Sequence, residues 1–166
     1  VLTEVSVHTA SFLFATEENK MKQHSRYQTA RRLLIFWTLF VAIGAVGGAL
    51  GMLLDPSGKR MGMDTMLPYF QILPFAEIVF QDFTFSGCAL LIVNGLTNLT
   101  AAGLLLAKKR AGVIAGGIFG VTLMLWICIQ FYMFSLNFMS TAFFVIGFCQ
   151  AATGYAAWVF YRQEQF

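Results

Sequence analysis

Four long stretches of the sequence contain no Asp, Glu, Lys, Arg or His, and these stretches set what the chain can fold into. They cover residues 33–54, 83–107, 111–134 and 138–161. At about 1.5 Å per residue, the shortest of them reaches ~33 Å as a helix, enough to cross a hydrocarbon core of ~30 Å. The sequence therefore predicts an all-α integral membrane protein built as a four-helix bundle.

The composition also indicates that lipid surrounds most of the chain. Hydrophobic residues make up 58% of the chain and charged residues only 11%, whereas soluble domains average about 25% charged residues. A globule of 166 residues could not bury this much apolar surface, because so much of a small fold lies at its boundary. The net charge is +3, and the basic groups adjoin the spans instead of forming a nucleic-acid-binding face. We expect membrane lipids as partners and no nucleic acid.

The basic residues also predict the topology. Nine of the eleven Lys and Arg residues lie between Lys20 and Arg32 before the first span, at Lys108–Arg110 between the second and third, and at Arg162 after the fourth. By the positive-inside rule, both termini of this multi-pass protein are cytoplasmic, and we expect a bacterial plasma membrane. Residues 1–20 are interpreted as an extension, either a tail or a short interfacial helix, outside a single membrane domain of residues 21–166.

The longest connection, residues 55–82, joins the first two spans on the outer side. Its second half is apolar but is interrupted by Pro68 and Pro74, so it is too broken to cross the membrane. An apolar interfacial or re-entrant segment is expected here.

Amide side chains are the main polar groups inside the spans. Asn94 and Gln150 each lie about 16 Å from the outer end of their helices at ~1.5 Å per residue, and Asn98 shares a face with Asn94. We expect Asn94 and Gln150 to face the interior and to bond each other directly or through a shared group. Two interpretations remain open, a structural hydrogen bond and the polar floor of a small apolar pocket. The missing intramembrane charge argues against proton coupling.

Two further residues lie nearer the predicted outer surface. Gln130 continues a stripe of small residues in the third span, and Trp126 lies one turn before it. They are expected either to line an outward opening or, in the case of the aromatic side chain, to anchor the helix at the interface.

Glycines recur at helical spacing in three of the spans. Such surfaces let backbones approach closely, which is how membrane helices associate. The candidates for helix packing are Gly44, Gly47, Gly51, Gly112, Gly116, Gly120, Gly147 and Gly154.

Two acidic residues lie where the outer segment enters the second span. Glu77 and Asp82 would suit acid–base work at the outer surface, but no histidine or nucleophile accompanies them, and solvated loop acids are the alternative. His8 and His24 lack metal-ligand spacing. We predict no catalytic residues, no metal and no cofactor.

Three segments carry a resemblance to a known class. They are LLDPSG at Leu53–Gly58, QDFTFSGCALLIVNGL at Gln81–Leu96 and LWICIQ at Leu125–Gln130. With these segments, the chain resembles small uncharacterised bacterial four-helix membrane proteins, DoxX-like in layout. The resemblance implies the architecture more than an activity.

Three functions are weighed on these grounds. The first is a non-enzymatic bundle that acts as a partner subunit, in a hetero-complex or a homodimer, or binds a small apolar molecule or lipid. The second is a small homo-oligomeric transporter of a neutral or lipophilic solute. The third is a membrane enzyme that uses Glu77 and Asp82.

Overall fold

The computed structural model describes residues 2–134 and 136–164, with side chains from Thr16 onwards. This part of the chain is helical and contains no strand. The predicted all-α class is confirmed for these residues, and four helical stretches are long and apolar enough to cross a membrane. They are Thr16–Leu54 within α1 (Leu2–Leu54), Thr84–Leu106 (α4, Thr84–Leu90; η3, Leu91–Leu96; α5, Thr97–Leu106), α6 (Arg110–Met133) and α7 (Phe138–Gln163).

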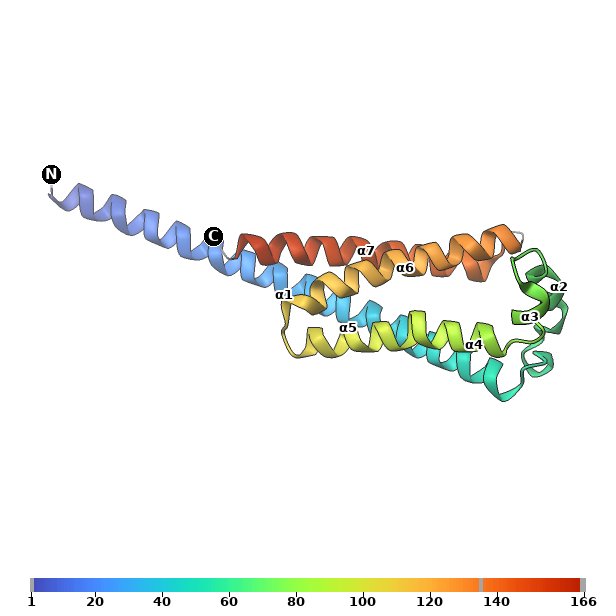
Figure 1. The fold of residues 1–166 in the computed structure, drawn as a ribbon. Coiled ribbons are helices and arrows are strands. Elements are labelled where there is room, and N and C mark those ends of the chain that lie inside the picture. Colours follow the sequence, from blue (N-terminus) through green and yellow to red (C-terminus); the bar gives the residue numbers. More distant parts are fainter. Residues whose placement is uncertain (1, 135, 165–166) are drawn as a thin grey trace.

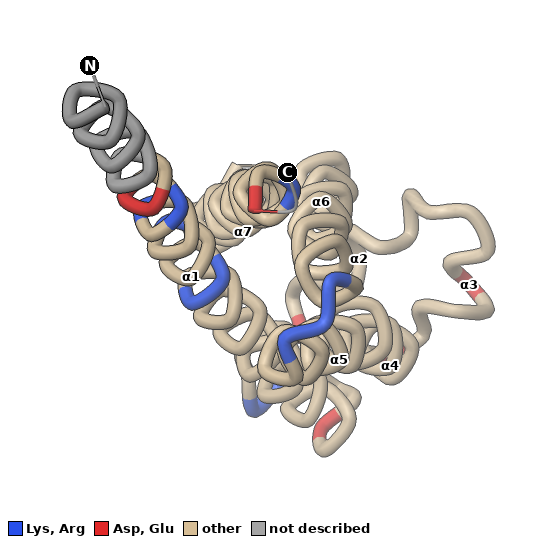
Figure 2. Tube along the Cα trace, turned by 90° about the vertical axis from the view of Figure 1, so that its left-hand side faces the viewer, with Lys and Arg blue, Asp and Glu red and all other residues tan. Residues whose placement is uncertain are grey.

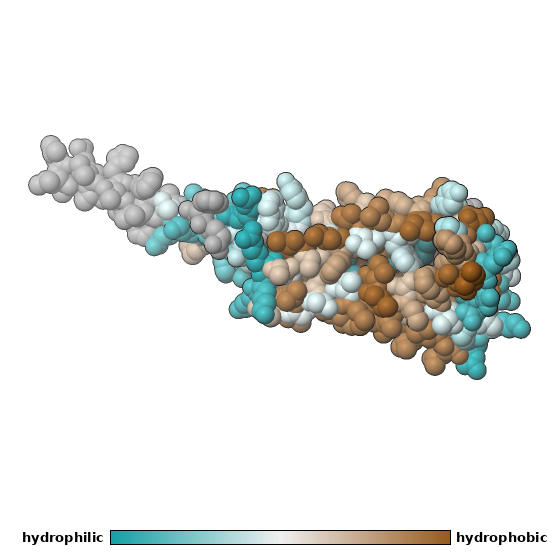
Figure 3. Space-filling model, in the orientation of Figure 1, coloured by the Kyte–Doolittle hydropathy of each residue, from teal (hydrophilic) through white to brown (hydrophobic). Residues whose placement is uncertain are grey.

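The four stretches lie side by side (Figure 1). Figure 3 shows a hydrophobic belt between two hydrophilic ends. Large side chains such as Ile43, Leu125 and Phe148 are more than half exposed within this belt. Such a surface is compatible with a multi-pass membrane protein, since lipid replaces water around it.

The helix α1 begins well before the first predicted span. It passes through the basic residues Lys20–Arg32 without a break and ends at Leu54. Residues 2–20 are therefore continuous with the first span in one helix. Asp55 and Pro56 follow Leu54, where the chain turns toward the segment between the first two spans.

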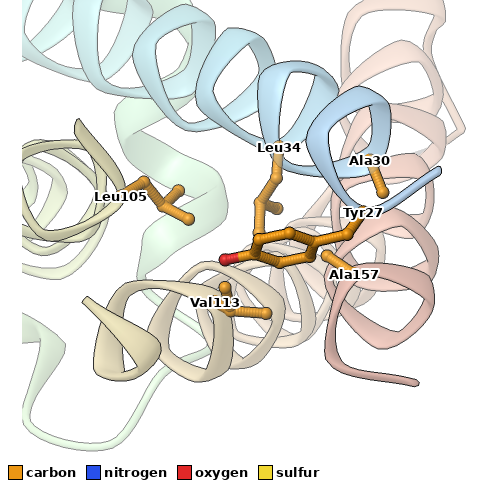
Figure 4. Close-up of a cluster of buried hydrophobic side chains, with 6 residues drawn as sticks. All are labelled: Tyr27, Ala30, Leu34, Leu105, Val113 and Ala157. Carbon is orange, nitrogen blue, oxygen red and sulfur yellow. The ribbon is translucent and has the colours of Figure 1, made fainter. Parts of the chain in front are cut away.

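One end of the molecule, here called the basic end, carries the cations of α1, of the turn between α5 and α6, and of the end of α7 (Figure 2). All four spanning stretches meet there around one buried cluster (Figure 4). Tyr27 and Leu34 of α1 pack against Leu105 of α5, Val113 of α6 and Ala157 of α7. This shared core fixes the relative positions of the four helices at the basic end.

The opposite end, the loop end, holds residues 55–83. Short helices follow one another along this segment (η1, Lys59–Met61; η2, Asp64–Met66; α2, Leu67–Phe70; α3, Ala76–Val79). Phe83 is fully buried, and its backbone N–H donates to Pro56 O at 3.0 Å. Gly58 has φ of 72°, and a Cβ there would stand 2.6 Å from the Phe83 ring. The two segments LLDPSG and QDFTFSG thus meet at this contact.

The second span contains a π-helical turn, η3, over Leu91–Leu96. Side chains of the following turn donate to carbonyls within it: Thr97 Oγ1 to Val93 O at 2.5 Å and Asn98 Nδ2 to Asn94 O at 2.9 Å. Single π turns inside α-helices are often found at functional sites. This one places Asn94 and Gly95 in the interior.

Candidate functional site: a buried amide cluster

Three spanning stretches contribute to a buried polar cluster between the helices. Gln150 Nε2 on α7 donates to Asn98 Oδ1 on α5 at 2.8 Å and to the carbonyl of Gly116 on α6 at 2.9 Å. Gln150 and Asn98 are fully buried, and Asn94 is 1% exposed. The cluster therefore joins α5, α6 and α7 away from solvent.

The hydrogen bonds of the cluster are incomplete. Within the described residues, Asn94 Oδ1, Asn94 Nδ2 and Gln150 Oε1 are buried without a hydrogen-bond partner. A buried polar atom without a partner destabilises a fold by about 1–3 kcal/mol, so each such atom needs an explanation such as a bound molecule. The atoms that remain unpartnered are two acceptors and one amide donor.

The chemistry of the cluster is that of neutral amides. Amide groups neither gain nor lose a proton near neutral pH, so the cluster contains no general acid or base. It is suited to bind a neutral group that both donates and accepts a hydrogen bond, such as a hydroxyl. A charged group would enter without a counter-charge, and burial of an unpaired charge is strongly unfavourable.

The hydrogen-bond partner of Gln150 differs from the one that the sequence indicated. Gln150 bonds Asn98, whereas the side chain of Asn94, one turn away, has no partner in the described chain. The expectation rested on equal depth, counted from the outer ends of the two helices at ~1.5 Å per residue. The count assumed a regular α-helix and did not include the π turn Leu91–Leu96.

Gln130 and Trp126 lie apart from the amide cluster. Gln130 Oε1 accepts from Ser140 Oγ at 3.1 Å, near the turn between α6 and α7. Asn137, at the start of α7, accepts from the Ser140 N–H at 2.8 Å. Trp126 packs against a second apolar cluster that contains Val41, Leu123 and Ile127. These contacts join α1, α6 and α7 toward the loop end.

Five of the eight candidate glycines lie at close contacts between helices. A Cβ at Gly120 would stand 2.5 Å from the Ala151 nitrogen, and one at Gly147 would stand 3.0 Å from the Gly120 carbonyl. A Cβ at Gly154 would collide with the backbone of Gly117. These contacts bring α6 and α7 close enough for Gln150 to reach the Gly116 carbonyl. A Cβ at Gly112 would likewise meet the backbone of α5, and one at Gly116 would meet the side chain of Leu34 on α1.

The glycines of α1 have different surroundings. Gly44 and Gly47 are exposed, and a Cβ at Gly47 would meet no atom within 4 Å. Gly51 faces Met61 of the loop end, whose sulfur would stand in the way of a Cβ. Gly47 therefore faces outward from this chain, whereas a Cβ at Gly44 would stand 4.0 Å from the Phe143 ring of α7.

The acidic residues at the loop end form no acid–base pair in the described residues. Glu77 is exposed and its backbone carbonyl accepts from Gln81 Nε2 at 3.0 Å. Asp82 Oδ1 accepts from the Thr84 N–H at 2.8 Å, at the first residue of α4. Asp82 thus stabilises a helix start. From Thr16 onwards, no three His, Cys, Asp or Glu side chains of the described chain are grouped closely enough to bind a metal ion.

One buried charge was not identified as an interior contact from the sequence. Arg31 is 9% exposed, and its Nε and Nη2 donate to the Leu105 carbonyl at 3.0 and 2.8 Å. Cations near a helix C-terminus interact favourably with the last carbonyls and with the helix dipole. The sequence indicated only topology for Arg31, because nothing in it shows that the end of α5 lies beside α1.

Comparison with protein-family models, curated proteins and solved structures found no match.

Proposed function

We propose that this chain is a non-enzymatic four-helix membrane bundle that binds a small, largely apolar molecule or lipid through the amide cluster. The observation that supports this role is the set of unpartnered buried atoms, Asn94 Oδ1, Asn94 Nδ2 and Gln150 Oε1. A bound hydroxyl would donate to one of the acceptors and accept from the amide. The apolar remainder of the molecule would lie among the surrounding side chains or extend between helices into lipid.

The proposal includes a location. The layout resembles that of small bacterial membrane proteins, and we place the chain in a bacterial plasma membrane. The basic end would face the cytoplasm with both termini, as the positive-inside rule predicts. Residues 55–83 would lie at the outer surface, where exposed side chains such as Ile72, Phe75 and Ile78 would enter the headgroup region.

Native mass spectrometry of protein extracted gently from its own membranes tests the binding role. We expect the wild-type chain to carry a discrete additional mass and Asn94→Leu to lose it, since leucine has a similar shape and no polar atoms. The matched control is Gln130→Leu, which changes an amide outside the cluster and should keep the mass. An unliganded wild-type chain would contradict the proposal and favour transport of a neutral solute.

A series of model compounds sharpens the test. A long-chain alcohol should bind the purified protein at least about tenfold more tightly than its methyl ether, because the ether cannot donate to an unpartnered acceptor. Equal affinities would show that apolar contact alone accounts for binding. In Asn94→Leu the preference for the alcohol should shrink or disappear.

A partner-subunit role is a second candidate, favoured by the exposed Gly44 and the outward-facing Gly47. Small residues allow another helix to approach closely. Gly47→Leu should then release a partner chain or dissociate a homodimer in the same mass measurement while the monomer stays folded. An unchanged assembly would exclude this surface.

A further inference from the structure

A groove lies between α1 and α7 at the basic end, separate from the amide cluster. Its volume is about 510 Å³. From Arg26 to Leu33, helix α1 rises by about 10 Å, so the groove extends from the hydrophilic rim into the apolar belt. Its polar mouth is formed by Ser25, Arg26 and Thr29, and its apolar part includes Leu33, Ala152 and Ala156.

Small side chains make this groove. Ala152 is exposed and Ala156 is half-buried on α7, while Phe160 lines the groove nearer its mouth. The apolar part is thus open along the direction of the helices. This shape suits a hydrocarbon chain that enters from the surrounding lipid.

The mouth carries a cation that has no counter-ion among the described side chains. Nearby basic side chains are engaged: Lys22 pairs with Glu18, and His24 Nδ1 lies 3.0 Å from Glu164 Oε1. Arg31 donates to the Leu105 carbonyl. Within residues 16–134 and 136–164, no carboxylate forms an ion pair with Arg26. Its guanidinium is free to meet an anion, for which its planar fork is suited.

We propose that this groove binds a phospholipid with an anionic headgroup. The phosphate lies against the Arg26 guanidinium and the Ser25 hydroxyl, and one acyl chain follows Leu33, Ala152 and Ala156. Basic pockets between transmembrane helices bind anionic headgroups in this way. A headgroup with its own ammonium would bring a second cation to Arg26 and bind less well. This site is independent of the amide cluster, because its ligand is charged at the rim.

The test uses the full chain in nanodiscs that contain phosphatidylglycerol and phosphatidylcholine of equal chain length. Native mass spectrometry after release counts the lipids that remain bound. We expect wild type to retain phosphatidylglycerol in preference to phosphatidylcholine. Arg26→Gln should lower the affinity for phosphatidylglycerol about fivefold, since one cation near an anionic headgroup contributes about 1 kcal/mol. The matched control is Arg32→Gln, an exposed arginine of the same helix that does not line the groove.

Two further variants separate the contribution of the Arg26 charge from that of the shape of the groove. Ala152→Leu should reduce lipid retention without altering charge, because it fills the groove from an exposed position that the fold tolerates. Arg26→Lys should retain most of the binding. Equal losses in Arg26→Gln and Arg32→Gln would overturn the proposal in favour of diffuse attraction. Equal retention of the two lipids, or displacement by inorganic phosphate alone, would also overturn it.

Discussion

Gln130 and Gln150 are the two glutamines within the apolar spans, and they differ in how completely they are bonded. Gln130 lies near the α6–α7 turn, is half-buried and accepts from Ser140 Oγ. Gln150 is fully buried, donates to two acceptors and leaves its own oxygen without a partner in the described chain. The same residue type on the same helix pair thus serves packing near the surface and presents an unpartnered acceptor at depth.

This difference distinguishes a polar side chain that stabilises helix packing from one that is available to bind a ligand. A hydrogen bond between membrane helices stabilises them by about 0.6 kcal/mol on average, and Gln130 fits such a role. An unpartnered buried atom has the opposite effect on stability. The unpartnered oxygen of Gln150 therefore favours a binding role for this residue over a structural one.

The largest expected effect comes from the helix contact that holds Gln150 in place. Gly154→Ala would drive a Cβ into the backbone of Gly117 and push α7 away from the Gly116 carbonyl. We expect a loss of about 1–3 kcal/mol, typical of overpacking, measured by thermal unfolding in detergent. The reciprocal Gly117→Ala meets the Gly154 Cα at an ordinary 3.4 Å and should cause no loss. Equal effects of the two changes would contradict this packing.

The two asparagines should respond in opposite directions. Asn94→Leu removes two unpartnered atoms and should raise the stability of the ligand-free protein by about 1 kcal/mol or more, while it abolishes ligand binding. Asn98→Leu removes the acceptor of Gln150 and should lower stability. Reversible unfolding in mixed micelles measures both. If Asn94→Leu lowered the stability, the Asn94 side chain would have a structural role, and the buried cluster would not differ from Gln130 in the way described above.

A smaller effect is expected at the other glutamine. Gln130→Leu removes the acceptor of Ser140 Oγ and should reduce stability by about 0.6 kcal/mol without changing ligand affinity. Thermal unfolding and a binding titration on one preparation give both values. A loss of ligand affinity would show that the α6–α7 turn communicates with the cluster.

The smallest effect concerns pH and lies outside the spans. Hydrogen bonds from the Ser57 hydroxyl and the Arg60 backbone N–H hold the pKa of Asp55 below its usual value. A carboxyl with a lowered pKa stabilises the fold fully above its unfolded pKa of about 3.9 and loses that contribution as the pH falls through the folded pKa. The Arg60 amide proton should therefore shift in NMR spectra below about pH 4, and the shift should vanish in Asp55→Asn. The amide cluster, which has no ionisable group, should not respond.

The helical class was predictable because a charge-free segment that crosses lipid has to be helical or part of a closed barrel. Runs without charge such as residues 111–134 must satisfy their backbone internally, so their length and composition suffice. The structure places this span at Arg110–Met133. The interior position of Asn98 and Gln150 was also readable, since amides on an otherwise apolar helix avoid lipid.

The details of the site depend on geometry that the sequence does not encode locally. Residue counts along a helix do not reveal the π turn at Leu91–Leu96, and equal depth from the outer ends paired Gln150 with Asn94. The contact of Arg31 with the Leu105 carbonyl depends on how the end of α5 meets α1. Both features are set by tertiary packing, which overrides local pattern.

A π turn contains about one residue more than an α-helical turn, so a second register of this span would arise if the turn at Leu91–Leu96 adopted regular α-helical bonding. A return to regular α-helical bonding would leave that turn with one residue fewer and move the residue into the next turn. Helix α4 would then rotate by about 100° and shift ~1.5 Å along its axis. This screw motion would carry Asn94 away from the cluster and turn Phe83, whose ring lies against Gly58. A molecule bound to Asn94 would favour the present register. Binding at the amide cluster would therefore set the rotation of α4 and, through Phe83, the position of the segment at the loop end.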